Sequence, residues 1–386
     1  MTRRTVSVRS LLIAVGLLVL AAIIAVQIGL ARAIFYEMYA FVKGDEIVAD
    51  SVLRISPQNS PYQQWLEQSS SQVPIFEGWA IDDIATIDLR AWSQQGEGVR
   101  GLYLHFAGYQ MTDGRLIEIP PGGKTDSQRK LYEKAIYFVS GEGYTVLQQE
   151  GQPLQRVAWK AGDLFSVPLN VLHQHFNSGG EPARLLTITT FPLVLNVFDS
   201  ERFIDKSTHA FTERYDFEPE FLSSVKEASD YELETNFVED IGTVGTRRHD
   251  FRGEGNSTIR WLMAGNSMLD LHISEMPPRM YKKAHRHSSD AFILLLSGEG
   301  FSVTWREGAY DERKRVDWKA GTLFVPPMFW YHQHLNSGST PARYLAINVP
   351  RVVKNLGMRF EDQIEVDLEE VQDEWERELR KVATEP

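Results

Sequence analysis

Two pairs of histidines, each with one residue between its members, are the part of the sequence best suited to chemistry. His285 and His287 form the first pair, and His332 and His334 form the second. Side chains two residues apart on a β-strand point to the same face, so two facing strands would gather three or four imidazoles. Imidazole is a ligand for Zn, Cu, Fe and Ni. The spacing therefore predicts a transition-metal site without carboxylate or thiolate ligands.

The alternative is a metal-free barrel in which these histidines are hydrogen-bonded core residues. A single buried histidine is usually of that kind, but four at this spacing on two strands are not independent of one another. A metal held by three protein ligands keeps coordination positions open, which Lewis-acid or oxygen chemistry requires. No catalytic residue beyond the metal ligands is indicated.

An internal repeat supplies the elements that must position these histidines. The offset between the two copies is 157 residues for SGEG (140–143 and 297–300) and 159 for HQH (173–175 and 332–334). Two inserted residues in one loop account for the difference. Six blocks recur in the same order: EIPPG and EMPPR, then SGEG, WKAG, HQH, NSG and PAR. The repeat predicts two domains of one fold.

Each copy has the pattern of an all-β domain, because short runs of β-branched and aromatic residues alternate with Gly, Pro and Asn turns. We place the first copy at 96–200 and the second at 251–352. Residues 34–95 are an extension without a readable motif. Residues 201–250 are interpreted as a linker packed on the barrels, with a helix-like stretch at 218–228.

The carboxyl-terminal region, 353–386, is predicted to contain a helix. Apolar residues recur there at steps of three and four, which places them on one helix face. We expect this helix to dock on a barrel, and self-association through the same face is the alternative. The residues of this apolar face are Ile364, Leu368, Val371, Trp375, Leu379 and Val382.

The amino-terminal region, 1–33, has the composition of a membrane anchor. Residues 11–30 are uncharged and, as a helix, would span the roughly 30 Å of a bilayer core. The arginines that precede them place the amino terminus in the cytoplasm and the barrels outside it. Cleavage near Ala33, which would give a secreted protein, and a buried core helix are the alternatives.

Composition removes several classes of function. Cysteine is absent, which excludes disulfides, thiolate metal sites and cysteine nucleophiles. The net charge of −12 argues against nucleic acid as a partner. Neither a nucleophile elbow nor a nucleotide-binding glycine motif is present, and the GEG segments, lying between two strands, are interpreted as hairpin turns.

The second copy resembles the cupin superfamily. HRH at 285–287, Ala291 and Gly298 follow the spacing of the first cupin motif, and Gly321, Pro327, His332, His334 and Asn336 follow the second. With the duplication, this implies a bicupin: two tandem jelly-roll barrels. The pattern is most similar to that of gentisate 1,2-dioxygenase and related ring-cleaving bicupins. The resemblance implies His285, His287 and His332 as metal ligands and Ala291 in place of the usual glutamate ligand.

The first copy departs from this pattern. Gln128 and Lys130 stand where the second copy has His285 and His287, although His173 and His175 remain. We expect a structural barrel in which these two histidines are hydrogen-bonded. The alternative is a second pocket in which Lys130 binds an anion.

Several residues near the motifs are candidates for the wall of a ligand pocket. His334, Trp330 and Phe292 are the ones we select, although aromatic residues also fill barrel cores. Lys282, Lys283 and Arg286 flank the histidine strand and would attract a carboxylate.

These observations predict a membrane-anchored bicupin with one divalent transition metal in its second barrel. By resemblance the metal is Fe(II) and the protein a dioxygenase-like oxidoreductase acting on a small aromatic or hydroxy acid. Because an oxidising compartment keeps iron poorly reduced, Mn, Zn, Cu and Ni are alternatives. The rival hypothesis is a non-catalytic scaffold of a membrane complex. Partners are the small-molecule substrate and the bilayer, and the family resemblance implies a homo-oligomer.

Overall fold

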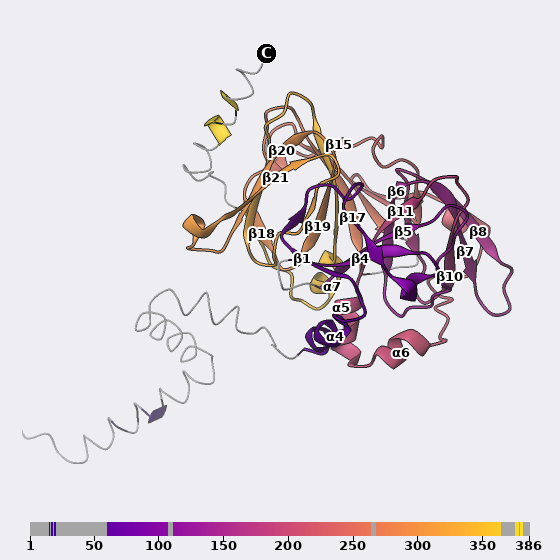
Figure 1. Cartoon of the computed structure of the whole chain (residues 1–386). Coiled ribbons are helices and arrows are strands. Elements are labelled where there is room, and N and C mark those ends of the chain that lie inside the picture. The colour runs from indigo at the N-terminus through magenta and orange to yellow at the C-terminus, as the bar shows by residue number, and fades with distance from the viewer. Residues whose placement is uncertain are drawn as a thin grey trace, which may run out of the picture. The chain divides into compact units, whose positions relative to one another are not determined.

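The structure is a computed structural model that describes residues 60–106, 111–263 and 268–363, with a few residues outside these ranges (Figure 1). Gln58–Pro386 form one compact unit. The anchor predicted at 11–30 lies almost wholly outside the described residues. Within those residues, no helix has the length and apolar character needed to cross a bilayer.

The first barrel consists of a larger and a smaller sheet. The smaller sheet has the order β10 (Leu172–Asn177), β7 (Glu142–Gln148), β8 (Gln155–Lys160). The larger sheet has the order β1 (Ile75–Gly78), β4 (Arg100–Phe106), β5 (Asp113–Ile119), β11 (Ala183–Thr189), β6 (Lys134–Ser140), β9 (Leu164–Val167), β14 (Phe237–Val238), with β3 (Arg90–Ala91) beside β4.

The second barrel repeats this arrangement. Its smaller sheet has the order β21 (Lys314–Lys319), β20 (Glu299–Trp305), β23 (Tyr331–Asn336), β18 (His285–His287), β25 (Glu361–Gln363). The larger sheet has the order β12 (Lys226–Ser229), β13 (Glu232–Thr235), β16 (Ser257–Met263), β17 (Asp270–Met276), β24 (Ala342–Asn348), β19 (Ala291–Ser297), β22 (Leu323–Phe324), β2 (Ala80–Ile81), with β15 (Arg247–Arg248) beside β16.

The helices are short. They are α4 (Pro61–Ser69), α5 (Phe191–Phe198), α6 (Glu201–Lys206) and α7 (Pro350–Asn355). α4 packs against α5, and the Tyr62 backbone N–H donates to Asn196 Oδ1 at 3.0 Å. Of the apolar face predicted for the carboxyl-terminal helix, the structure describes Trp375 and Leu379. These two residues pack on Tyr281, Phe301 and Trp305 of the second barrel. The other residues of this apolar face lie outside the described residues.

The duplication begins earlier than the sequence blocks indicated. β1, β2 and β3 of the predicted extension match β13, β14 and β15 of the predicted linker at the same offset of 157 residues. The helix expected at 218–228 is replaced by a 3-10 turn at Pro219–Leu222 and by β12. β12 forms instead of a helix because β13 offers it a backbone hydrogen-bonding partner.

The two barrels exchange strands. β2 precedes the first barrel in the chain but pairs with β22 of the second, with Ile81 opposite Leu323. β14 precedes the second barrel but pairs with β9 of the first, with Val238 opposite Leu164. Each larger sheet is therefore completed by a strand from the other copy.

The loops that follow the exchanged strands explain the glycine of the repeated WKAG block. Ile84 N–H donates to the Gly321 carbonyl, and Ile241 N–H donates to the Gly162 carbonyl, both at 2.9 Å. Gly321 and Gly162 have φ of +93° and +94°. A Cβ atom at Gly321 would lie only 2.5 Å from Asp83 Oδ1 of the exchanged loop. The positive φ favours glycine at both positions, and at Gly321 a side chain would also collide with the exchanged loop.

Two buried carboxylates reinforce this junction. Glu133 of the first copy accepts the backbone N–H groups of Met268 and Leu269 at 2.7 and 2.8 Å. Asp290, its counterpart, accepts those of Met111 and Thr112 at 3.0 and 3.3 Å, together with the Thr112 hydroxyl. Each barrel therefore holds a backbone segment of the other.

A shared hydrophobic core lies between the two larger sheets. It joins buried side chains of both copies, and Phe106 meets Phe292 edge to face at 5.7 Å. Its members include Leu102, Leu104, Leu116, Leu186 and Ile188 from the first barrel and Ile259, Trp261, Ile273, Leu345 and Ile347 from the second. Residues on the opposite faces of these sheets point into the barrels.

Asp290→Asn tests the buried carboxylate at the junction. Burial raises the pKa of Asp290 to about 7, so the folded protein holds this proton more tightly than the unfolded chain does. Its contribution to stability is present below the ordinary carboxyl pKa and is lost as pH rises toward 7. Three pH units correspond to at most about 4 kcal/mol. We expect the unfolding free energy of the wild type to fall relative to that of the variant between pH 4.5 and 7.5, measured by urea denaturation. Parallel pH profiles would contradict this assignment.

Candidate metal centre

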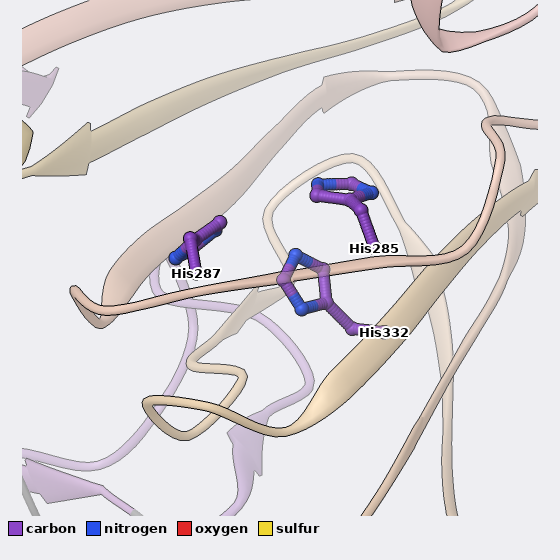
Figure 2. A group of neighbouring side chains, drawn as sticks. All are labelled: His285, His287 and His332. Carbon is purple, nitrogen blue, oxygen red and sulfur yellow. The ribbon is translucent and has the colours of Figure 1, made fainter. Parts of the chain in front are cut away.

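Two strands of the second barrel bring the predicted ligands together. β18 carries His285 and His287, β23 carries His332, and His285 lies directly opposite His332 in the antiparallel pair. Figure 2 shows the three rings turned toward one space. One ring nitrogen from each residue lies within 4.8 Å of the others. The strand alternation that predicted a common face is realised.

Backbone carbonyl groups orient the three rings. Nδ1 of His285, His287 and His332 donates to the carbonyls of Lys283, Ser289 and Trp330 at 2.9, 2.5 and 3.2 Å. Each bond fixes the tautomer with the proton on Nδ1 and leaves the Nε2 lone pair free. Metal-ligating histidines are ordinarily held in this way through their other nitrogen.

The surroundings keep these imidazoles neutral. Burial lowers the pKa of His285 and His332 well below the ordinary value, and the neighbouring histidines and Arg252 lower it further. The pKa of His287 is also lowered, chiefly by burial. A metal requires the neutral ring, so these shifts favour coordination over protonation.

The donor set fits a mononuclear divalent transition metal. Three neutral nitrogen donors at this spacing suit metal–nitrogen bonds of about 2.0–2.1 Å. The position of the usual fourth ligand is Ala291, which lines the same cavity and offers no donor. Asp290, the adjacent carboxylate, points toward Met111 and Thr112 of the first copy, as the predicted alternation of faces requires. A metal held by the three histidines would therefore meet no protein donor on the side of Ala291.

His334 lies beside the three ligands and does not join them. It is absent from the group of converging nitrogens, and its Nδ1 is 2.8 Å from Ser302 Oγ. The Trp318 indole N–H donates to the same hydroxyl at 3.0 Å. Burial, with Lys282 nearby, lowers the pKa of His334 to about 3. His334 is a neutral wall residue, and Trp318 has the structural role expected from its recurrence in both copies.

A cavity of about 710 Å³ opens above the three histidines. Six cationic side chains line it, against three carboxylates, in a chain whose net charge is −12. The cations are Arg252, Arg260, Lys282, Arg351, Lys354 and Arg359, and the carboxylates are Glu232, Asp270 and Glu361. Arg252, Arg260 and Arg359 form ion pairs with these carboxylates, and the remaining excess of cationic side chains suits the cavity to an anion.

Polar atoms without protein partners also face this cavity. His272 Nδ1 and Asn348 Oδ1 are buried and form no hydrogen bond within the described part of the chain. Asn348 lies directly opposite Ala291 in the β19–β24 pair, beside the vacated ligand position. Lys282, also buried, donates to Ser274 and Tyr344 at 2.7 and 2.8 Å. The cavity wall offers hydrogen bonds to a polar ligand.

Two predicted pocket residues are placed elsewhere. Phe292 lies in the core between the barrels, because strand alternation turns it away from the face that carries Ala291. The Trp330 ring packs on Trp79 at 5.6 Å and does not line the cavity, although its carbonyl orients His332. Arg286 also points away and pairs with Glu307. Of the flanking cations, Lys282 alone lines the cavity.

The carboxyl-terminal strand is a component that the sequence did not reveal. β25 pairs with β18, so that Glu361 lies opposite His287. Glu361 forms ion pairs with Arg252 and Arg359 at the cavity wall. Arg252 lies close enough to all four histidines to lower the pKa of each. β25 therefore pairs with the strand that carries His285 and His287, and its Glu361 holds Arg252 near these histidines.

The first barrel has no corresponding centre. Within the described residues, the three histidines of the second barrel are the only group arranged to hold a metal. His175 Nδ1 is 2.8 Å from Thr145 Oγ1, which is the hydrogen-bonded role expected for it. Lys130 forms an ion pair with Asp205 of α6 at 2.6 Å. The alternative of an anion bound by Lys130 is therefore not supported.

Comparison with known proteins finds a cupin domain in the first barrel and solved structures similar to the two-barrel fold. The cupin domain family matches residues 115–189, within the first barrel. The salicylate 1,2-dioxygenase of Pseudaminobacter salicylatoxidans matches with a TM-score of 0.50 and 15% identity, over 69% of this chain and 81% of that one.

Oxalate decarboxylases match less closely. That of Lactobacillus farciminis gives a TM-score of 0.47 and 11% identity over 80% of this chain and 96% of that one. A mutant of the Bacillus subtilis enzyme gives a TM-score of 0.46 and 12% identity over 78% of this chain and 84% of that one. No curated protein sequence matches the chain.

Metal content tests the centre directly. We expect the purified full-length chain to hold about one equivalent of metal, and His332→Ala to lose it, because two imidazoles form a weak site. His209→Ala, which removes an exposed histidine outside the centre, is the matched control. Since all three ligand pKa values are lowered, loading by mass spectrometry should stay constant from pH 8 to pH 6. Equal metal in the wild type and His332→Ala would rule out this site.

Proposed function

Since the chain is a two-barrel member of the cupin superfamily, we propose that its second barrel binds one divalent transition metal and oxidises a small organic anion with molecular oxygen. The observation that carries this proposal is the histidine triad, whose Nε2 atoms converge while Ala291 leaves one side open. The metal would supply a site at which substrate and oxygen meet. By resemblance it is Fe(II), with Mn, Zn, Cu and Ni as alternatives.

The cavity supports an aromatic or hydroxy-acid anion as the substrate. Arg252, held by Glu361, would orient a carboxylate above the histidines. The Asn348 amide oxygen accepts hydrogen bonds, so it would bind a hydroxyl donor beside the open side of the metal. His272 would hydrogen-bond the same molecule from the wall. Burial excludes competing water from these contacts.

We further propose that residues 11–30 anchor the chain in a membrane with the barrels outside the cytoplasm. The support for this is the uncharged stretch and the preceding arginines. In that compartment, metal supply decides which ion the triad takes.

Oxygen uptake tests the activity. The full-length chain, loaded separately with Fe(II), Mn(II), Zn(II), Cu(II) and Ni(II), would be offered gentisate, salicylate, catechol and an aliphatic hydroxy acid. We expect uptake with a carboxylate-bearing hydroxylated compound, and none in the His285→Ala/His287→Ala variant. A fully loaded protein that consumes no oxygen with any combination of metal and compound would favour the rival function, a non-catalytic scaffold.

Arg252→Gln tests anion orientation. Removing a charged hydrogen-bond donor should lower kcat/KM for a carboxylate substrate by roughly 10- to 100-fold, or about 1.5–3 kcal/mol. Metal content should be unchanged, because Arg252 is not a ligand. Lys314→Gln on β21, which removes an exposed cation of the same barrel, is the control. An equal loss of kcat/KM for catechol, which has no carboxylate, would contradict this role.

A further inference from the structure

The metal position of the second barrel has a direct structural counterpart in the first. His285 faces His332 across β18 and β23, and Gln128 faces His173 across the corresponding bridge. Lys134 begins β6 as Ala291 begins β19. The family's metal-binding residues are therefore represented here by Gln128, Lys130, Lys134 and His173, of which only His173 is a common transition-metal ligand. A metal does not fit this set.

His173 nevertheless keeps the orientation of a ligand. Its Nδ1 is 2.9 Å from the Val171 carbonyl, as His332 Nδ1 is 3.2 Å from that of Trp330. Burial is the main cause that lowers the pKa of His173 well below its ordinary value, so the ring is neutral. Its Nε2 lone pair points inward and requires a partner.

Lys134 provides that partner. Its Nζ is 3.0 Å from His173 Nε2 and 3.0 Å from Gln128 Oε1. Both partners are at positions that hold metal ligands in the second barrel. The lysine side chain is buried and enters from the position of the missing glutamate ligand, so its nitrogen reaches the centre of the group.

Tyrosine and arginine side chains stand in the first barrel at positions whose counterparts line the cavity of the second. Tyr103, Arg115 and Tyr132 occupy the positions of Arg260, His272 and Ser289, at the offset of 157 residues.

A hydrogen-bonded network holds these side chains in place. The Tyr103 hydroxyl donates to Asp113 at 2.5 Å, and Arg115 donates to the Tyr132 hydroxyl at 2.5 Å. α4 adds Tyr62, whose hydroxyl is 2.9 Å from that of Tyr103. The Lys134 amine is thus enclosed with its partners.

We infer that the side-chain amine of Lys134 takes the place of a metal ion in the first barrel, and that Gln128, Lys130 and Lys134 keep metal out of that barrel. The amine satisfies the inward lone pairs of His173 and Gln128, whose counterparts His332 and His285 would bind the proposed metal in the second barrel. The first barrel thereby keeps a fixed interior without depending on metal supply. This inference goes beyond the proposed function, because it holds whether or not the second barrel is catalytic.

The triple variant Gln128→His/Lys130→His/Lys134→Ala tests it by giving the first barrel the residue set of the second. After loading the full-length chain with Co(II), mass spectrometry and visible absorption would count bound metal. We expect two equivalents in the variant and one in the wild type. A folded variant, checked by circular dichroism, that still binds one equivalent would overturn the inference.

The same three substitutions in the His285→Ala/His287→Ala background separate the two barrels. One equivalent is then expected, held by the first barrel alone. A wild type without metal beside a triple variant with one equivalent would refute the proposed function and support this inference. Metal in neither protein would refute both.

Lys134→Ala provides a second test that does not depend on a new metal site. The substitution leaves the lone pairs of His173 and Gln128 without their hydrogen-bond donor and opens a cavity, so the melting temperature should fall. n-Propylammonium supplies the missing atoms and should restore part of the loss, whereas tetramethylammonium, which donates no hydrogen bonds, should not. Equal effects of the two ions would mean that Lys134 acts only by filling space.

Discussion

The exchange of β2 and β14 between the barrels is the constraint on which the rest of the structure depends. Neither larger sheet is complete without a strand from the other copy, and edge strands with unpaired backbone groups are costly to leave exposed. Glu133 and Asp290 then hold backbone segments across the same junction. The barrels are therefore not independent domains joined by a linker, and the core between them fixes the sheet that carries Ala291 and Asn348.

Within this common frame the two interiors have diverged by a few side chains. Backbone carbonyls orient His173 as they orient His332, so both barrels present a lone pair to the same internal point. In the first barrel the Lys134 amine lies at that point. In the second barrel the matching residue is Ala291, which leaves the point free of a protein donor. Tyr132 and Arg115 stand in the first interior where the second has the smaller Ser289 and His272, which line its cavity.

The sequence was most informative where the alternation of side chains along a strand coincided with residues that commonly bind metals. Strand alternation placed four histidines on common faces, and the resemblance to cupins selected His285, His287 and His332 among them as ligands. Phe292 was misplaced because β19 is apolar on both faces, so hydrophobicity does not distinguish the cavity from the core. β2, β14 and β25 have two or three residues each and pair with strands distant in the sequence, which leaves no local periodicity to detect. The membrane anchor at residues 11–30 and the homo-oligomeric state remain predictions.

The reciprocity of the strand exchange has an evolutionary consequence. Equivalent strands that complete each other's sheets form an isologous contact, the geometry of a twofold-symmetric homodimer. A single-barrel ancestor could have met its partner in this way before gene duplication and fusion joined them. In such a homodimer the two subunits share one gene, so every substitution changes the interior of both barrels. Fusion would remove that restriction, and one half would then be free to place Lys134 beside His173 while the other keeps three converging histidines.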